Sequence, residues 1–580
     1  MNSSPELDAV VSFIIAIDFG TAYSGYAFNI TSSDKESDHH LKRWGKEQRL
    51  ETPKTPTCIL FNEDGKFMLF GYEAKAAYIK MREEEAKKHL FFENFKMALY
   101  AKGFKGSKDM KIKAANGKEM TALKVFTETL GYLKSDALKT VTETTGRKLQ
   151  ASNFTWVLTV PAIWDHSAKQ FMREAAAQAG IVTEGDKNKL VIALEPEAAS
   201  IWCKKLPADC FITQNLSENA LDQSAGTKYI VVDCGGGTID MTVHEVLRGG
   251  ALKELHKASG NDLGGQTVDR KFKEFLREIF CDGVWDEYER NYPSEVQEMM
   301  YDFTFLKQLD EDVEIYCSFN LGMLAQKKQN IEKFFESVEG ASWDEGAIKI
   351  SRNKLRSFFA ESLKISEEIG EIIKKDFSID YVLLVGGFAN SLVLRQHSID
   401  QFSKRCKVLC PVSPQEAIVR GAVEFGRNPE VVVSRKSRFT YGVAVCEPFD
   451  ESKYKPEKKI TADGKDWCQD VFGRLLDEGQ DVYCKETTEH VVCLVNENQK
   501  LMEIRFYRTE RKDPKYVDDW GVEEVGSVKV DLPDITGGRE REVRVEILFG
   551  STEITATATD VVSGSEGSVS FNFLTEAETS

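Results

Sequence analysis

One stretch of the sequence, Tyr229–Thr242, constrains the fold more than any other. It reads YIVVDCGGGTIDMT, an apolar run that ends in Asp233. Three glycines follow this aspartate: Gly235, Gly236 and Gly237. An apolar run into a glycine turn predicts a buried strand followed by a tight hairpin. Because glycine has no Cβ, the backbone N–H groups of such a turn can close on an anion such as a phosphate.

The polar side chains around this turn indicate how a phosphate would be held there. Thr238 offers a hydroxyl donor, whereas Asp233 and Asp240 would repel a phosphate at close range. Carboxylates beside a phosphate are typical of a site in which a divalent cation joins the two. For this stretch alone, an ordinary glycine-rich hairpin without a ligand is an equally good interpretation.

A second copy of the pattern favours the ligand-binding interpretation. The stretch Phe13–Phe28 reads FIIAIDFGTAYSGYAF, in which an apolar run again ends in an aspartate, Asp18. Gly20 and Thr21 follow, and a second strand-like run comes after them. One Asp-x-Gly-Thr match is weak, but an ordered pair predicts two related lobes that grip one nucleotide from opposite sides.

Length and charge limit the class of protein. A chain of 580 residues predicts roughly two to four domains. Hydrophobic residues make up 42% and charged residues 29%, a mixture typical of soluble globular proteins. The formal net charge of −17 argues against a protein that binds nucleic acid or an anionic membrane surface.

The cysteines and the first residues indicate the compartment. The twelve cysteines are scattered and form no Cys-x-x-Cys pair, which favours free thiols over disulfides or a zinc site. The apolar run Val10–Ile17 is too short to cross a membrane. Glu6 and Asp8 precede it, where a signal peptide would carry Lys or Arg. We therefore expect a cytoplasmic protein without a membrane span, with the nucleus as the alternative.

Two charged residues are further candidates for the site. The spacing of apolar residues predicts a helix over Ala74–Tyr100, with Lys96 beside its apolar face. A surface lysine that lies over the core is the alternative for Lys96. In Leu190–Trp202, Glu195 follows a predicted strand, at the end where α/β folds place their ligands. A solvated loop carboxylate is the alternative for Glu195.

Two glycine pairs predict further turns at which the backbone can approach a ligand. Gly264-Gly265 precedes a predicted helix, and Gly386-Gly387 follows the predicted strand Ile379–Val385. The other elements up to residue 428 also alternate between strand and helix. We expect a strand over Phe154–Val160, helices over Thr121–Thr142, Lys354–Lys375 and Pro414–Phe425, and helical insertions over 282–345.

The character of the sequence changes after Asn428. Helical patterns stop, and apolar residues alternate with polar ones in stretches such as 502–506, 543–547 and 554–558. Turn residues separate these stretches. The pattern predicts an antiparallel β domain with one polar face.

These motifs, in this order, resemble those of the heat-shock 70-kDa protein family, whose ATPase domain has the fold of actin and sugar kinases. IDFGTAYSGYAF resembles its first phosphate motif, VVDCGGGTIDMTV its second, and LLVGGFANSLVLR its adenosine motif. TVPAIWDHSAKQFMREAAAQAGI and LEPEAASIW resemble two segments that join them. The likeness covers residues 13–425, extends into the β domain and is greatest to the divergent member-12 branch.

The resemblance implies an ATP or ADP site with Mg²⁺. Asp18, Glu195 and Asp233 would organise Mg²⁺ through its waters, and Lys96 would act with Glu195 and Asp233 in catalysis by orienting the attacking water. The nucleotide would contact Asp18, Gly20, Thr21, Tyr23, Gly235, Gly236, Gly237, Thr238, Asp240, Gly265, Gly386 and Gly387. Positioning and charge neutralisation would drive in-line attack by water.

The sequence departs from the family pattern where adenine would bind. Phe388 and Asn390 replace a serine and an arginine after the adenosine glycines, and Ala22 replaces a threonine of the first phosphate motif. Thr304 replaces an acid in the segment where Lys307 is retained. The replacements at Phe388, Asn390 and Thr304 predict a weak grip on adenine and poor selectivity for it.

The predicted architecture is α/β. A polar tail over 1–12 precedes a two-lobed actin-like ATPase domain over 13–428. A linker over 429–440 then leads to an antiparallel β-sandwich over 441–576, with no helical lid. The family's acidic and leucine-rich linker is replaced by basic VVVSRKSRFTYGV, which predicts weak coupling between the domains.

Three functions are compatible with this architecture. The first is an ATP-binding, weakly hydrolysing chaperone-like protein that binds peptides or protein partners through its β domain. The second is a signalling or scaffold protein in which ATP is a structural or switching ligand. The third, a metabolite kinase, is disfavoured because kinases of this fold do not need a peptide-binding module.

Overall fold

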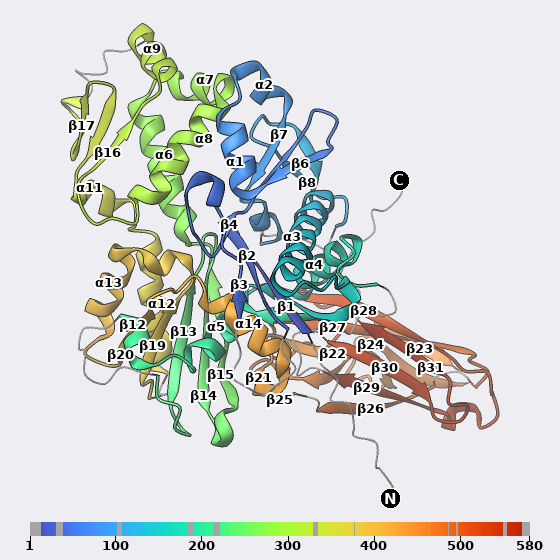
Figure 1. Ribbon diagram of the computed structural model, residues 1–580. Coiled ribbons are helices and arrows are strands. Elements are labelled where there is room, and N and C mark those ends of the chain that lie inside the picture. The colour runs from blue at the N-terminus through green and yellow to red at the C-terminus, as the bar shows by residue number, and fades with distance from the viewer. Residues whose placement is uncertain are drawn as a thin grey trace, which may run out of the picture.

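The chain forms two lobes with a further body of strands beside them (Figure 1). This computed structural model describes residues 13–570 apart from 31–38, 101–106, 184–188, 213–220, 329–334, 376–377, 463, 485, 495–496 and 549–553. The tail predicted over 1–12 lies outside the described residues. Lobe I denotes the described part of 13–194, lobe II that of 211–436 together with 481–483, and the C-terminal sheets the remaining described part of 440–570.

Lobe I is built on a six-stranded sheet, ordered β11-β10-β1-β2-β3, with β4 paired to β2. The strands are β1 Phe13–Phe19, β2 Tyr23–Asn29, β3 His40–Leu41, β4 Thr55–Pro56, β10 Phe154–Val160 and β11 Leu190–Leu194. β1 runs antiparallel to β2, as predicted, and parallel to β10. Helices α3 Ala122–Thr145 and α4 His166–Gln178 share one hydrophobic core with β1 and β10.

The upper part of lobe I differs from the sequence prediction, because the helix expected over Ala74–Tyr100 is wrong beyond its first turns. Helices α1 Gly71–Ile79 and α2 Glu83–Lys88 are followed by strand β7 Leu90–Glu93 and the 3-10 helix η2 Phe95–Leu99. β7 pairs with β5 Cys58–Phe61, which also pairs with β6 Phe67–Phe70. The apolar run of β7 is buried as a strand, where aromatic residues pack well, and this pairing overrides the helical spacing.

Lobe II repeats the plan of lobe I in an eight-stranded sheet, ordered β12-β20-β19-β13-β14-β15-β21-β25. The strands are β12 Phe211–Ile212, β13 Lys228–Cys234, β14 Ile239–Val246, β15 Leu252–Asn261, β19 Tyr381–Val385, β20 Lys407–Pro411, β21 Val432–Lys436 and β25 Asp481–Tyr483. β13 runs antiparallel to β14 and parallel to β19, as β1 does to β2 and β10. The two aspartate-glycine hairpins therefore hold equivalent places in the two lobes.

The rest of lobe II mixes helices with a small sheet. Its helices are α6 Gly265–Ile279, α7 Val284–Asn291, α8 Pro293–Leu306, α9 Phe319–Lys328, α11 Arg352–Ser357, α12 Ile365–Lys374 and α13 Leu392–Phe402. The expectation of purely helical insertions over 282–345 is wrong, since β16 Val313–Tyr316, β17 Ala341–Asp344 and β18 Ala347–Ile350 form a sheet. The single helix predicted over Lys354–Lys375 is broken between α11 and α12, where Phe358 and Phe359 turn into the core.

Two helices lie between the lobes and join them. α5 Glu195–Cys203 and α14 Ala417–Arg427 pack so closely that a Cβ at Gly421 would lie 1.6 Å from the carbonyl oxygen of Ala198. Their apolar side chains share one core with Ile14 of lobe I and Leu383 of lobe II. The small residues at this crossing fix α5, and with it Glu195, against both sheets.

The C-terminal strands form two antiparallel sheets, ordered β23-β24-β22-β27-β28 and β26-β29-β30-β31. They are β22 Thr440–Pro448, β23 Lys459–Ala462, β24 Lys465–Leu476, β26 Thr487–Cys493, β27 Leu501–Thr509, β28 Val522–Asp531, β29 Glu542–Leu548, β30 Thr555–Asp560 and β31 Glu566–Ser570. Residues of both sheets, such as Phe506 and Val545, belong to one buried core. The described helices include none long and apolar enough to cross a membrane.

The middle of the segment expected to be a linker, 429–440, lies in the sheet of lobe II. Its strand β21 runs parallel to β15, and β25 from the following part of the chain pairs antiparallel with β21. Arg435 on β21 makes two hydrogen bonds to Glu197 of α5, from Nε at 2.9 Å and from Nη2 at 2.8 Å. Both side chains are buried. The basic sequence of this segment is thus partly explained by a buried acidic partner.

Candidate nucleotide site

The two glycine turns meet where the lobes face each other. A Cβ at Gly236 would lie 2.6 Å from the Cβ of Ala22, and a Cβ at Gly237 would lie 2.8 Å from Oγ1 of Thr21. Glycine is required at both positions, because no side chain fits between turns that approach this closely. The predicted opposition of the two hairpins is therefore present in the structure.

Three buried carboxylates gather beneath these turns: Glu195, Asp233 and Asp240. Each offers one oxygen, and the three oxygens lie within 4.8 Å of one another. Oδ1 of Asp233 is buried without a hydrogen-bond partner in the described chain. Burial, reinforced by Glu195, raises the pKa of Asp233 well above its usual range and that of Asp240 to about 7. Carboxylates held this close in a dry site are typical ligands of a divalent cation, so the residues fit Mg²⁺.

The composition of this cluster differs from the prediction in one residue. Asp18, predicted beside Glu195 and Asp233, is buried nearby, but both of its oxygens are occupied: Thr159 donates a hydrogen bond to Oδ1 at 3.0 Å, and the ammonium of Lys54 lies 2.5 Å from Oδ2. Asp240, predicted among the residues that contact nucleotide but not among the three metal ligands, takes the third place. Its Oδ2 accepts a hydrogen bond from Thr238 at 2.9 Å.

Lys96 lies inside the site rather than on the surface. Its side chain is 2% exposed, and its Nζ lies 2.7 Å from Oε1 of Glu195. The ammonium also lies 5.1 Å from the centre of the Trp164 ring. Glu195 is itself buried at the first position of α5. Neither the surface-lysine alternative nor the solvated-carboxylate alternative describes this buried ion pair.

The turn of lobe II offers backbone donors. The N–H of Gly235 closes the hairpin by donating to the carbonyl of Thr238 at 2.9 Å. The N–H groups of Gly236 and Gly237 have no acceptor among the described residues. Gly265, predicted to contact nucleotide, donates its own N–H to the carbonyl of Gly235 at 3.1 Å, so it supports the turn.

Lobe I contributes a turn of the same kind. A Cβ at Gly20 would lie 2.2 Å from the carbonyl oxygen of Tyr23, which makes glycine obligatory there. Thr21 is buried at the tip. The Tyr23 phenol lies in β2 near Tyr301 of lobe II, and burial raises its pKa. Its side chain thus faces the neighbouring lobe.

The glycines predicted to pass under adenosine differ in their surroundings. Gly386 has φ 85°, and a Cβ there would lie 2.4 Å from Oδ1 of Asp233. A Cβ at Gly387 would have no neighbour within 4 Å in the described chain. Phe388 stacks on Phe359 at 6.0 Å and covers Gly265, where a Cβ would approach its ring to 3.2 Å.

The lysine retained from the predicted adenosine clamp is engaged within lobe II. Nζ of Lys307 donates to both carboxylate oxygens of Asp269 at 2.7 Å and to the carbonyl of Gly265 at 2.8 Å. Thr304 donates its hydroxyl to the carbonyl of Tyr301 at 2.7 Å. With threonine at 304 in place of the acid, Lys307 is held by Asp269 and Gly265 of helix α6.

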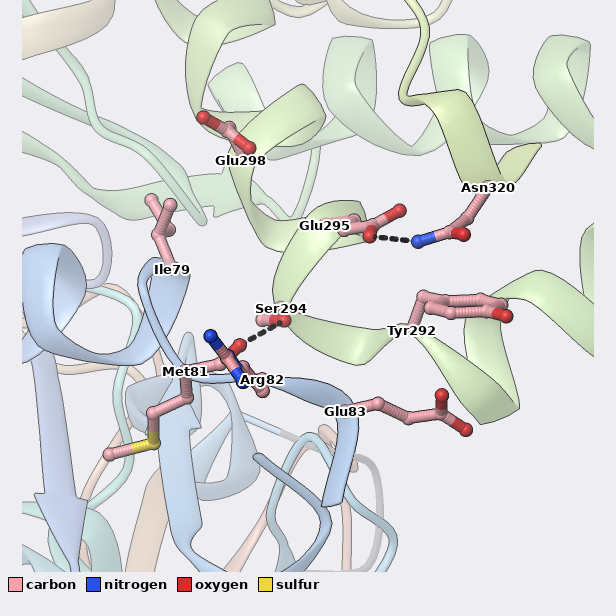
Figure 2. A pocket seen from close by; sticks show the side chains of 9 residues that line it. All are labelled: Ile79, Met81, Arg82, Glu83, Tyr292, Ser294, Glu295, Glu298 and Asn320. Carbon is pink, nitrogen blue, oxygen red and sulfur yellow. Dashed lines mark hydrogen bonds between the residues drawn. The ribbon is translucent and has the colours of Figure 1, made fainter. Parts of the chain in front are cut away.

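The tips of the lobes are in contact above the turns, around a pocket of about 470 Å³ (Figure 2). Ser294 of α8 donates a hydrogen bond to the carbonyl of Met81 at 3.1 Å, across the gap between the lobes. Lys75 of α1 donates to Gln297 of α8 at 2.9 Å. These bonds join helix α8 of lobe II to lobe I.

Comparison with known proteins agrees with this geometry. The family model described as Hsp70 protein matches residues 15–427. The chain belongs to the Hsp70 family. Its two lobes are the Hsp70 ATPase domain, with the actin-like fold that the hairpin motifs predicted. Members of this family bind ATP or ADP with Mg²⁺.

The similarity to individual Hsp70 proteins extends beyond the ATPase lobes. Heat shock 70 kDa protein 12A of Homo sapiens is 33% identical over 618 residues, 97% of this chain and 91% of that protein. The Mus musculus protein of the same name gives the same values. Heat shock 70 kDa protein 12B of Homo sapiens is 33% identical over 635 residues, 98% of this chain and 92% of that protein. The predicted resemblance to the member-12 branch is thereby confirmed.

Sequence reasoning missed Lys54, Thr159 and Trp164. Lys54 stands in an ordinary polar stretch, TPKTPT, which carries no sign that its ammonium is buried. Thr159 lies at the end of β10, whose position beside β1 could have suggested a partner for Asp18. Trp164 follows the Val-Pro-Ala segment, and only the fold brings it under Lys96.

Proposed function

We propose that this chain binds ATP with Mg²⁺ between lobes I and II and hydrolyses it slowly. The observation that carries the proposal is the buried cluster of Glu195, Asp233 and Asp240 beneath two opposed glycine turns, with the ammonium of Lys96 paired to one of its carboxylates. We assign the ATPase domain to 13–428, the connection to 429–440 and the C-terminal domain to 441–576, with strands β21 and β25 of the last two segments completing the sheet of lobe II.

Each group has a role that follows from its position. The N–H groups of Gly236 and Gly237 would donate to phosphate oxygens, since anions bind readily to such backbone turns. Glu195, Asp233 and Asp240 would hold Mg²⁺, which supplies charge neutralisation for the transferring phosphoryl group when it is bound. Lys96, positioned by Glu195 and Trp164, would orient the attacking water.

Gly387 provides the sharpest test of nucleotide binding. A valine at this position fits the free protein, because the space around its Cβ is open among the described residues. If adenosine passes over Gly387, Gly387→Val should weaken ATP binding by about 100-fold or more, since the side chain would occupy the space of the ligand. Isothermal titration calorimetry would measure the affinity, and thermal unfolding would check that stability is retained.

Gly370→Val is the matched control, because a Cβ at this position in α12 also meets open space in lobe II. It should leave ATP affinity unchanged. Gly236→Val is a poorer test, since its side chain would already collide with Ala22 in the free protein. Equal ATP affinity of Gly387→Val and Gly370→Val would contradict the assignment of the adenosine side of the site.

We further propose that the C-terminal sheets form a β-sandwich without a helical lid, which binds an extended segment of a peptide or protein partner. The support is their two antiparallel layers around one core and the similarity of the whole chain to Hsp70 proteins. Main-chain hydrogen bonds and a few side-chain pockets would supply the affinity, as in other sites that bind an added strand. Fluorescent-peptide binding by the full chain would test this.

A second function, an ATP-liganded scaffold or signalling protein without refolding activity, is favoured by one observation. The residues Phe388, Asn390 and Thr304 stand where the family pattern has groups that grip adenosine. ATP that is bound but hydrolysed very slowly would serve as a structural or switching ligand. Turnover measured with and without unfolded peptide separates the two, since a chaperone cycle requires stimulation by peptide.

A further inference from the structure

The side chain of Lys54 extends over Gly25 of β2 and ends in the nucleotide site. In the β1–β2 ladder, Asp18 is paired with Gly25. Lys54 precedes β4, which pairs with the neighbouring part of β2. A Cβ at Gly25 would lie 3.1 Å from Cγ of Lys54, so the lysine stem lies across the face that this glycine leaves free. Its ammonium ends 2.5 Å from Oδ2 of Asp18.

The pair is buried as deeply as the rest of the site. The Lys54 side chain is 9% exposed and that of Asp18 is 2% exposed. Thr159 donates to the other oxygen of Asp18, so this carboxylate is fully engaged by the protein. Each charge of such a buried ion pair depends on the other, because water cannot solvate either charge if its partner is removed.

The sum of the charges in the site indicates the role of the Lys54–Asp18 pair. The four buried carboxylates are Asp18, Glu195, Asp233 and Asp240, and the two buried ammonium groups paired with them are Lys54 and Lys96. With all groups ionised, four negative and two positive charges leave a deficit that one divalent cation neutralises. Without Lys54 the same cation would leave one negative charge beside the phosphates.

We propose that Lys54 is a positioning residue of the nucleotide site: it neutralises Asp18, and so supplies from the protein a positive charge that a metal ion would otherwise provide. This inference rests on the proposed binding of ATP. On this proposal Asp18 is neutralised by Lys54, and Glu195, Asp233 and Asp240 are the carboxylates that hold Mg²⁺. The proposal also predicts how nucleotide affinity depends on Mg²⁺, a property that packing alone would not change.

The test compares the affinity for a non-hydrolysable ATP analogue in EDTA and in excess MgCl₂, by calorimetry on the full chain. Lys54→Gln keeps a hydrogen-bond donor but removes the charge. We expect the affinity of Lys54→Gln for the analogue to fall much more in EDTA than in Mg²⁺. The dissociation constant in EDTA divided by that in Mg²⁺ should therefore rise by about tenfold or more. Lys54→Arg keeps the charge and should restore a ratio near that of the unaltered protein.

Lys204→Gln is the matched control. Lys204 is equally buried, at 8% exposure, but its ammonium donates to the carbonyl of Gly250 away from the carboxylates. Its removal should leave the ratio unchanged. If Lys54→Gln does not fold, Lys54→Met replaces it, because methionine keeps an unbranched stem over Gly25 and removes the charge.

Each outcome decides one of the two proposals. An unchanged ratio in Lys54→Gln overturns the role of Lys54 but leaves nucleotide binding standing. Absence of binding by the unaltered protein overturns the nucleotide site instead. In that case the role of Lys54 is tested by thermal unfolding with and without about 10 mM MgCl₂, since a ligand that binds more tightly stabilises the fold more. Mg²⁺ should stabilise Lys54→Gln more than the unaltered protein, and equal stabilisation overturns the inference.

Discussion

The buried pair between Arg435 and Glu197 should hold strand β21 in the sheet of lobe II. Arg435 lies on β21 and contacts both carboxylate oxygens of Glu197, whose side chain is 1% exposed. The N–H of the next residue, Lys436, donates to Oε2 of Glu254 at 2.8 Å. Arg435→Met would leave Glu197 charged in a dry environment without its partner. We therefore expect β21 and its neighbour β25 to detach from lobe II.

The size of the effect follows from the burial of the pair. Removing one partner of a buried ion pair costs about 3–5 kcal/mol, because the remaining charge is uncompensated. A loss of this size is a large part of the stability of a typical domain, about 5–15 kcal/mol. It should appear first as local opening, since detaching β21 and β25 exposes less apolar surface than unfolding the lobe.

Hydrogen exchange measured by mass spectrometry would detect this opening. Amides of 432–436 and 481–483 should exchange about 100-fold faster or more in Arg435→Met, if the full 3 kcal/mol appears as local opening. The double variant Arg435→Met/Glu197→Gln should recover most of the protection, because it leaves no unpaired charge. Arg505→Met is the control, since Arg505 is 53% exposed and its pair with Glu503 is a surface pair.

Two results would contradict the reasoning. One is exchange in Arg435→Met that matches the Arg505→Met control, which would mean that backbone pairing alone holds β21. The other is additive losses in the double variant, which would mean that the two side chains do not interact.

Four further outcomes are expected. Lys96→Ala should lower single-turnover hydrolysis of ATP by 10-fold or more, as a rough estimate, with little change in affinity, since a water-positioning group acts in the transition state. Competition between ATP and GTP should show weak selectivity, because Asn390 and Thr304 replace groups that would grip adenosine; a strong preference for ATP would contradict this. Burial, reinforced by Glu197, raises the pKa of Glu254 to about 8, above its unfolded value of about 4.3. The stability that the protonated Glu254 contributes is therefore full below about pH 4 and is lost as the pH rises through about 8. Glu254→Gln should flatten that fall in denaturant titrations between pH 5 and 8. Peptide release from the C-terminal sheets should be fast. Dissociation measured with ADP and with ATP shows how strongly the docked β21 couples the domains. A release rate that ATP accelerates strongly would contradict the weak coupling predicted from the basic linker.

Local sequence patterns sufficed for the elements that carry the phosphate turns. The runs before Asp18 and Asp233 are apolar throughout and end in glycine, and each formed the predicted strand and hairpin. The helix expected over Ala74–Tyr100 failed for a tertiary reason: Leu90–Glu93 pairs with β5, which lies about thirty positions earlier. A pairing partner cannot be read from the periodicity of one segment.

The site shows the same division between local and tertiary information. Glu195 could be placed because it directly follows a strand, and Lys96 because the family resemblance pointed to it. Lys54 could not, since its burial depends on the register that sets Gly25 opposite Asp18 and on the path of β4 across β2. The same lysine engages Asp18, whereas Asp240 lies with Glu195 and Asp233, and no local pattern in the sequence indicates either placement.

The course of the lobe II sheet decides how the chain can be divided for separate expression. A fragment ended near residue 430 would lack β21 and leave β15 as an open edge, and a fragment begun at 441 would carry β25 without its partner. Exposed edges of this kind recruit other chains and promote aggregation. Within the described residues, any single cut between β21 and β25 separates strands that pair, so a well-behaved ATPase fragment needs β21 together with a substitute for β25, such as a peptide carrying residues 479–484.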